Sequence, residues 1–247
     1  MINPVGAING KRNGAMRVAG ALYNFSAKHK QRKTIREEKM QIICIPPQGF
    51  AANSYIVTAD GKNAVVVDPA QPRVEDEVRR RGLVPAFVLL THVHFDHIGG
   101  VRGLRYLGAK VLCSADEAVL IGSDADLCEA FGALPPGFSA DGTFSDGETK
   151  ELCGLTVEAV FTPGHTAGSM CYLVRDEKDG GRALFTGDTL FRGSVGRTDF
   201  PTGSDSALRQ SLKKLARLDG GIPVYPGHGE GSTLADEREN NPFLIGL

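Results

Sequence analysis

Three histidines and an aspartate crowd into one short stretch of the chain, LLTHVHFDHIGG, although the chain has only six histidines in total. The apolar run FVLLT before them predicts a buried strand, and the Gly-Gly pair after them predicts a turn. On a loop at a strand end, the H-x-H spacing lets two imidazoles point the same way, toward one metal ion. The D-H pair can then face a second metal ion. Helical H-E-x-x-H motifs present their ligands differently. The candidate ligands of this loop are His92, His94, Asp96 and His97.

The other chemistry-bearing residues also follow predicted strands. His165 stands in FTPGHTAGS, Asp188 in LFTGDTLF and His228 in VYPGHGE, each within a glycine-containing turn that allows close backbone approach. Only His29 is left out of the pattern. A single histidine near a core edge is usually a hydrogen-bonded structural residue. Seven such side chains at strand ends together predict a metal site.

The ligand types narrow the chemistry of that site. Nitrogen and carboxylate oxygen without sulfur suit zinc, and they leave iron or manganese open. Seven ligands exceed one tetrahedral zinc, so we expect two adjacent divalent ions that share a carboxylate. Two ions roughly 3.5 to 4 Å apart can hold a hydroxide between them and polarise a carbonyl or phosphoryl group. The pattern therefore predicts a metal-dependent hydrolase.

Alternating strands and helices must position these residues. Runs rich in β-branched residues, broken by Gly and Pro, predict strands at residues 41–45, 53–59, 63–69, 86–91, 109–114, 155–162, 169–175, 182–187 and 222–227. Helices are predicted at residues 75–81, 101–107, 116–121 and 205–218. Residues 122–144 form a long polar connection, and a hairpin is predicted to turn at Asp146-Gly147. This order of elements predicts an α/β fold of layered sheets covered by helices.

The first 39 residues read as a separate segment. Residues 1–40 contain nine Lys or Arg and two acids, in a chain whose overall net charge is -1. We expect residues 1–39 to be a basic, disordered extension, either a targeting segment or an over-long start, and residues 40–247 to form the hydrolase domain. The acidic balance of that domain argues against a nucleic-acid partner.

The cysteines and the hydropathy of the sequence indicate the expected location of the protein and whether it spans a membrane. Five widely spaced cysteines, without any C-x-x-C pair, favour reduced thiols and a cytoplasmic location. No apolar run approaches the roughly 18 residues of a membrane span, so no membrane partner is expected. Nothing in the sequence indicates the oligomeric state.

THVHFDH with the downstream His, Asp and His resembles the metallo-β-lactamase superfamily. Within it, TPGHTAGS, GDTLFRGSVGRTDFPTGS and the C-terminal ERENNPFL are similar to the short, single-domain glyoxalase II-like (hydroxyacylglutathione hydrolase-like) proteins. The resemblance covers about residues 41–247. It implies a four-layer αββα sandwich with the metals at one edge.

The resemblance also implies roles for individual residues. The first metal would be held by His92, His94 and His165, and the second by Asp96, His97 and His228, with Asp188 bridging the two. Asp96 would also steer the attacking hydroxide or accept its proton. Asp68, at the end of AVVVDP, resembles a buried aspartate that fixes ligand geometry, although a strand-terminal Asp before a proline turn is the alternative.

The same comparison bears on the substrate. True β-lactamases of the superfamily lack an aspartate like Asp188, so a small acyl-thiol is expected instead, and a thiolate leaves easily. Full glyoxalase II enzymes add a helical domain that grips glutathione, and 19 residues after His228 are too few for one. We therefore leave the acyl group and thiol carrier open. Candidate substrate contacts are Arg197, Phe131 and Phe138. The alternative for Arg197 is a structural salt bridge, and the alternative for the two phenylalanines is a position in the core.

A second group of enzymes, with a different activity, resembles this sequence through the same motifs. Persulfide dioxygenases share H-x-H-x-D-H and GRTDF, but they use one iron, which here would be held by His92, His165 and Asp188. This iron-dependent oxidoreductase is the alternative to thioester hydrolysis.

Overall fold

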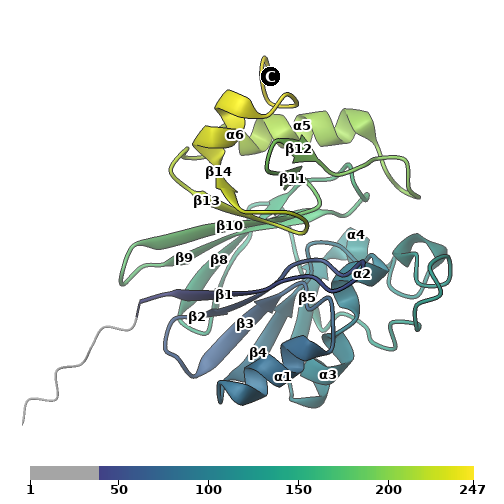
Figure 1. Cartoon of the computed structure of the whole chain (residues 1–247), viewed down its shortest axis with the longest axis vertical. Coiled ribbons are helices and arrows are strands. Elements are labelled where there is room, and N and C mark those ends of the chain that lie inside the picture. The colour runs from purple at the N-terminus through teal and green to yellow at the C-terminus, as the bar shows by residue number, and fades with distance from the viewer. Residues whose placement is uncertain (1–38) are drawn as a thin grey trace, which may run out of the picture. The chain divides into compact units, whose positions relative to one another are not determined.

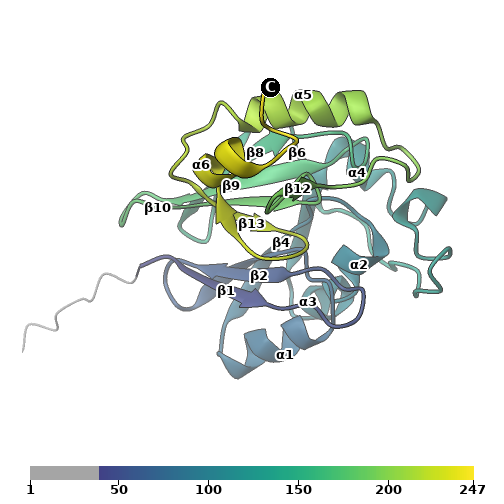
Figure 2. The same cartoon turned by 45° about the horizontal axis from the view of Figure 1, so that its top comes forward.

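The structure is a computed structural model that describes residues 39–247. Residues 1–38 lie outside the described residues, so the predicted extension is not addressed by it. Two six-stranded sheets face each other, and helices cover the outer face of each sheet (Figures 1 and 2). The predicted four-layer αββα sandwich is confirmed.

The first sheet is mixed. Its strand order is β1 (Gln41–Ile45), β2 (Ser54–Thr58), β3 (Asn63–Val67), β4 (Val84–Leu89), β5 (Lys110–Ser114) and β6 (Gly142–Phe144). Strands β1 to β3 are antiparallel, and β3 to β6 are parallel. Parallel neighbours need crossover connections, which here contain α1 (Arg73–Arg80), α2 (Phe95–Ile98), α3 (Val101–Tyr106) and α4 (Ala115–Ala118).

The second sheet contains the later part of the chain. Its order is β14 (Ser232–Thr233), β13 (Pro223–Pro226), β10 (Gly181–Gly187), β9 (Met170–Asp176), β8 (Leu155–Phe161) and β7 (Thr149–Leu152). Its outer face is covered by α5 (Asp205–Leu215) and α6 (Leu234–Asn240) (Figure 1). A small ribbon of β11 (Leu190–Phe191) and β12 (Ser194–Val195) follows β10, and a 3-10 turn lies at Asp124–Asp126.

Alternation along the strands builds three apolar layers. On β3, Val65 belongs to the core between the sheets, whereas Val66 belongs to the core under α1 and α3. On β10, Phe185 faces the other sheet and Leu184 faces α5. Because side chains point to opposite faces in turn, a strand buried on both faces reads as an unbroken apolar run.

The strand ends that carry the candidate ligands meet at one edge. β4 ends before His92, β10 before Asp188 and β13 before His228, and β10 and β13 are parallel. At this edge Met170 N donates a 2.9 Å hydrogen bond to Thr91 O, which joins the two sheets. A Cβ on Gly187 would lie 2.2 Å from Thr91 Oγ1, so only glycine allows this close approach.

Several details differ from the prediction, among them the ends of the helices predicted at 75–81 and 116–121, which are Arg73–Arg80 and Ala115–Ala118 in the structure. The hairpin at Asp146-Gly147 is wrong: β6 pairs with β5 in the first sheet and β7 with β8 in the second, so this turn is where the chain crosses between sheets. The true hairpin turns at Cys153 and Gly154, both with positive φ, the conformation that two-residue hairpin turns favour. Helix α6 was not predicted, and α5 ends at Leu215 rather than 218.

Candidate metal centre

The loop after β4 is more ordered than the sequence suggested. His92 and His94 lie outside any helix or strand, and His94 is the N-cap of α2. Asp96 and His97 lie on this single helical turn, whose first hydrogen bond runs from His97 N to His94 O at 2.9 Å. The expectation that all four residues lie on an irregular loop is therefore wrong. The turn brings the His97 ring to 4.0 Å from the His92 ring, centroid to centroid, and the three histidines of this stretch are buried.

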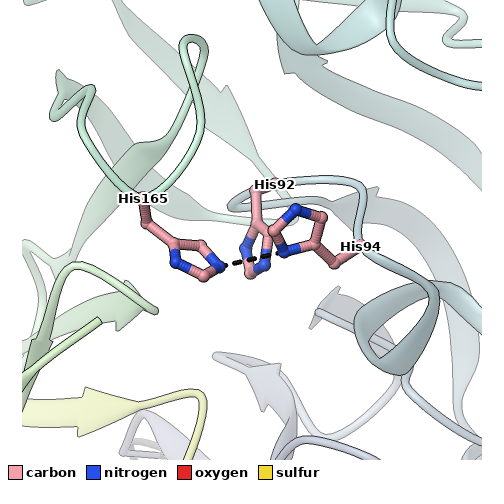
Figure 3. Close-up of side chains that lie close together, drawn as sticks. All are labelled: His92, His94 and His165. Atoms are coloured by element: carbon pink, nitrogen blue, oxygen red, sulfur yellow. Dashed lines mark hydrogen bonds between the residues drawn. The ribbon is translucent and has the colours of Figure 1, made fainter. Parts of the chain in front are cut away.

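The first cluster contains His92, His94 and His165, whose potential ligand atoms all lie within 4.8 Å of one another (Figure 3). The second sheet contributes His165, whose Nδ1 donates to the backbone oxygen of Arg197 at 2.7 Å. This bond leaves Nε2 without a proton and directs it at the cluster, where it lies 2.9 Å from His94 Nδ1. The three rings therefore converge on one point.

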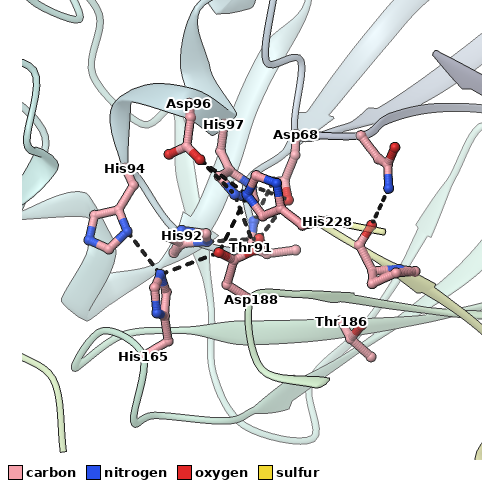
Figure 4. A network of polar contacts seen from close by, with 12 residues as sticks. Asp68, Thr91, His92, His94, Asp96, His97, His165, Thr186, Asp188 and His228 are labelled. Atoms are coloured by element: carbon pink, nitrogen blue, oxygen red, sulfur yellow. Dashed lines mark hydrogen bonds and ion pairs between the residues drawn. The ribbon is translucent and has the colours of Figure 1, made fainter. Parts of the chain in front are cut away.

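The second cluster contains Asp96, His97 and His228, and a third set combines His92 and His97 with Asp188. The Asp188 carboxylate lies between the clusters (Figure 4). Its Oδ1 is 3.3 Å from His97 Nε2, and its Oδ2 is 3.6 Å from both His165 Nε2 and His228 Nε2. One carboxylate thus faces both clusters.

These side chains fit a divalent metal. The buried atoms His92 Nε2, His97 Nε2 and Asp188 Oδ1 have no hydrogen-bond partner. His94 Nε2 has none either, but the nitrogen of that ring that meets His165 is Nδ1. Buried polar atoms are almost always satisfied, because each unsatisfied one costs about 1 to 3 kcal/mol. The opposite nitrogens of His92 and His97 are engaged, with Thr91 Oγ1 at 3.2 Å and Asp68 Oδ2 at 3.0 Å. A cation accounts for lone pairs that converge in this way.

The electrostatics of the cluster agree with that fit. Burial, followed by neighbouring histidines, lowers the pKa of His94 to about 3 and that of His92 well below its ordinary value. Burial opposes a charge on His97 too, but Asp188, Asp96 and Asp68 raise its pKa well above the usual range. Neutral imidazoles and ionised carboxylates are the forms that bind metal, and His92 and His94 are held in the neutral form. The carboxylates around His97 favour a positive charge at that position, which is either a proton on the ring or a metal ion that replaces it.

Comparison with known proteins now decides the family. The sequence profile described as the metallo-beta-lactamase superfamily matches residues 47–228. Hydroxyacylglutathione hydrolase GloC of Haemophilus influenzae is 35% identical over 213 residues, which are 83% of this chain and 98% of that protein.

The chain belongs to the metallo-β-lactamase superfamily.

Two solved structures support the same conclusion. BLEG-1 B3 metallo-beta-lactamase matches with a TM-score of 0.76 and 31% identity, covering 83% of this chain and 100% of that one. A di-iron-bound form of TTHA1623 matches with a TM-score of 0.71 and 32% identity, covering 82% and 100%. The metallo-β-lactamase fold binds divalent metals, in agreement with the clusters of histidine and aspartate described above. In the part of the chain that the structure describes, no helix has the length and apolarity to cross a bilayer.

In this metallo-β-lactamase fold, Asp68 ties two strand ends to one ligand. It follows β3 with a positive φ of 45° and is almost fully buried. Its carboxylate accepts hydrogen bonds from Thr91 N at 2.8 Å and Thr91 Oγ1 at 2.6 Å, and it accepts from His97 Nδ1 at 3.0 Å. A carboxylate on Nδ1 makes Nε2 the free nitrogen and fixes the ring.

Sequence reasoning missed Glu117, which is fully buried on α4. Its carboxylate accepts from Val93 N at 2.9 Å, from Gly168 N at 3.1 Å and from the Thr166 hydroxyl. It therefore joins the loop of His92 and His94 to the loop of His165. The only signal was Ser114 three residues earlier, a capping-box spacing that predicts a bond to the helix end rather than this inward direction.

A cavity of about 600 Å³ opens beside the clusters. Its ligand-type lining residues are His94, Asp96, His165, Asp188 and His228. Two predicted substrate contacts, Phe131 and Arg197, line it as well, and so does Phe200, which the sequence analysis did not select. Phe138 does not line the cavity. It packs against the core under α1 and α3, which agrees with the alternative prediction of a core position for this residue.

Arg197 takes part in more than one contact. Its guanidinium forms a two-point ion pair with Asp199, with Nε–Oδ1 and Nη2–Oδ2 both 2.6 Å, and it lies 4.0 Å from the Phe200 ring centre. Its backbone oxygen holds His165. The salt-bridge reading and the cavity-lining reading of this residue therefore both apply.

Proposed function

We propose that the protein is a binuclear metal-dependent hydrolase of thioesters of the hydroxyacylglutathione type. The observation that carries this proposal is the orientation of Asp188, whose two carboxylate oxygens face histidines of both clusters. A monodentate ligand of a single ion would not need that position. The identity to GloC, named as a hydroxyacylglutathione hydrolase, supports the thioester class.

In this proposal His92, His94 and His165 hold one ion, and Asp96, His97 and His228 hold the other, with Asp188 shared. Zinc suits the ligand types, and the di-iron form of TTHA1623 keeps iron as an alternative. When bound, such a pair lowers the pKa of a water molecule and polarises the substrate carbonyl.

The protein's own groups supply the rest of the reaction. Asp96 lines the cavity and stays ionised, because His97 and the His228 ring, 3.1 Å from its Oδ2, outweigh the effect of burial and lower its pKa. Its carboxylate accepts a hydrogen bond from the attacking water and so orients it. Attack on the carbonyl carbon breaks the C–S bond, and water and thioester become a carboxylic acid and a thiol. The thiolate needs no strong acid to leave.

The test combines metal analysis with a substrate panel on the purified full chain. We expect about two metal ions per chain and release of free thiol from S-lactoylglutathione or a simple acyl thioester. One iron per chain with oxygen uptake on glutathione persulfide would replace the proposal with the dioxygenase. Turnover of a β-lactam without thioester hydrolysis would also overturn it.

A further inference from the structure

Three phenylalanines form one side of the cavity, which we call the aromatic wall: Phe95, Phe131 and Phe200. The rings of Phe95 and Phe131 stack with centroids 4.5 Å apart and planes at 13°. Phe200 stands across Phe131, at 6.2 Å and 85°. The three residues come from α2, from the long connection after α4 and from the segment after β12, so the wall is a tertiary feature.

The wall begins at the metal centre itself. The Phe200 ring lies edge-on to His94 with centroids 5.8 Å apart. The cavity continues with further apolar residues, namely Phe50, Leu127, Phe191 and Val195. Phe131 is 50% exposed and Phe50 is 80% exposed, so two large apolar rings stand at the mouth in contact with water. Exposed apolar surface gathered at a cavity marks a binding site for an apolar group.

The charges on the cavity lining also favour an apolar group. Among the described residues that line the cavity, Arg197 is the one Lys or Arg. Its guanidinium is already balanced by Asp199 and lies against the Phe200 ring. An acyl group that carries a negative charge needs a cationic partner, and this lining offers no uncommitted one.

We propose that the substrate of this site carries an uncharged, apolar acyl group, an alkyl chain of medium length or a phenyl-bearing acyl group, and that the aromatic wall binds it. This inference rests on the proposed thioester hydrolysis. With the carbonyl carbon held at the clusters, the acyl chain runs from His94 past Phe200 to the stacked pair of Phe95 and Phe131. Each buried methylene contributes to binding, so longer acyl groups are preferred.

The experiment uses thioesters of one neutral thiol, N-acetylcysteamine, with acetyl, hexanoyl and phenylacetyl groups, beside S-lactoylglutathione. For the metal-loaded full chain, we expect kcat/KM for hexanoyl to exceed that for acetyl by about 100-fold, and to exceed that for S-lactoylglutathione. The acetyl thioester of hexanethiol places the apolar chain on the other side of the sulfur. It should be hydrolysed more slowly than the hexanoyl ester.

Variants locate the preference. Phe131→Ala should lower the hexanoyl-to-acetyl ratio about tenfold and Phe131→Leu much less, because leucine restores apolar contact. The matched control is Leu134→Ala, an 80% exposed apolar residue of the same connection that does not line this cavity. Its ratio should not change.

The outcomes separate this inference from the function on which it depends. Faster hydrolysis of S-lactoylglutathione than of the apolar esters would overturn the apolar acyl group and leave the thioesterase standing. A preference for the hexanethiol ester, or an unchanged ratio in Phe131→Ala, would overturn the role of the wall. Absence of any thioester turnover by metal-loaded protein would overturn both proposals.

Discussion

The metal clusters and the aromatic wall share one cavity, but they are held in different ways. In the clusters, His92, His97 and His165 are at most 3% exposed, and each ring has a protein hydrogen-bond partner on the nitrogen that faces away from the centre. In the wall, the Phe131 side chain is half exposed and lies against the rings of Phe95 and Phe200.

This difference separates chemistry from specificity. A metal ligand must be placed to within a fraction of an ångström, and directional hydrogen bonds hold His92, His97 and His165 in this way. Ring packing is less directional and tolerates exchange of one apolar side chain for another. If the wall binds the substrate as we propose, substitution of Phe131, which has no ring contact with a candidate metal ligand, should change the substrate preference and leave the clusters intact.

The largest effect is expected from removal of the Asp188 carboxylate, which faces both clusters. We expect Asp188→Ala to lower kcat at least about 10³-fold and to reduce the metal content, because both clusters lose an oxygen ligand. Thiol release and metal analysis measure this. The control is Asp219→Asn, an exposed carboxylate paired with Arg182, which should retain activity. Near-normal turnover in Asp188→Ala would contradict the bridging role.

A smaller effect is expected from the buried aspartate behind His97. In Asp68→Asn an amide N–H can donate to His97 Nδ1, which favours a proton on Nε2, the nitrogen that faces the centre. Metal affinity should fall by about 10- to 100-fold, as judged by competition with a chelator. The wall is untouched, so the hexanoyl-to-acetyl ratio of the metal-loaded variant should stay at the wild-type value. A changed ratio would show that the two regions are coupled.

Substitution of Glu117 tests whether the loop of His92 and His94 and the loop of His165 need the carboxylate that joins them. In Glu117→Gln the amide N–H must meet a backbone or hydroxyl donor, so the free energy of unfolding should fall by about 1 to 3 kcal/mol. Urea unfolding of metal-free protein measures this loss. Unchanged stability would show that the carboxylate does not hold the loops together.

The same variant has a pH signature. Burial raises the pKa of Glu117 to about 7, against about 4.5 in the unfolded chain. Between these values the folded protein retains a proton that the unfolded chain has released, so wild-type stability should fall as the pH rises from 4.5 to 7. Glutamine does not titrate, so the stability advantage of wild type over Glu117→Gln should be larger at pH 5 than at pH 8. An equal advantage at both pH values would contradict this assignment.

The smallest effect is expected from the first part of the chain. Both regions of the comparison lie within residues 40–247, and we propose that these residues form the hydrolase domain. A chain that begins at Met40 should keep its stability within about 0.5 kcal/mol and its kcat/KM within about twofold. Thermal unfolding and thiol release measure this. Loss of folded protein on truncation would contradict the domain boundary.

The sequence alone was enough to predict which histidines and aspartates meet in the clusters and where most of the strands lie. The ligands stand out because histidine is scarce and because each candidate directly follows an apolar run, a local pattern that needs no knowledge of contacts. Strands buried on both faces, such as β4 and β10, also carry their own signal in unbroken apolar composition.

Tertiary structure decided the partners of those residues. Glu117 binds Thr166, 49 positions away, and the Phe131 ring contacts the Phe200 ring on one side of the cavity. Neither pairing has a local pattern in the sequence. The sequence around Asp146-Gly147 is typical of a hairpin, yet the chain changes sheets there, because β6 and β7 each pair with a different neighbour. Local composition determines which residues are buried and which can bind metal. The packing of two sheets determines which distant side chains hold them in place and which line the space where the substrate binds.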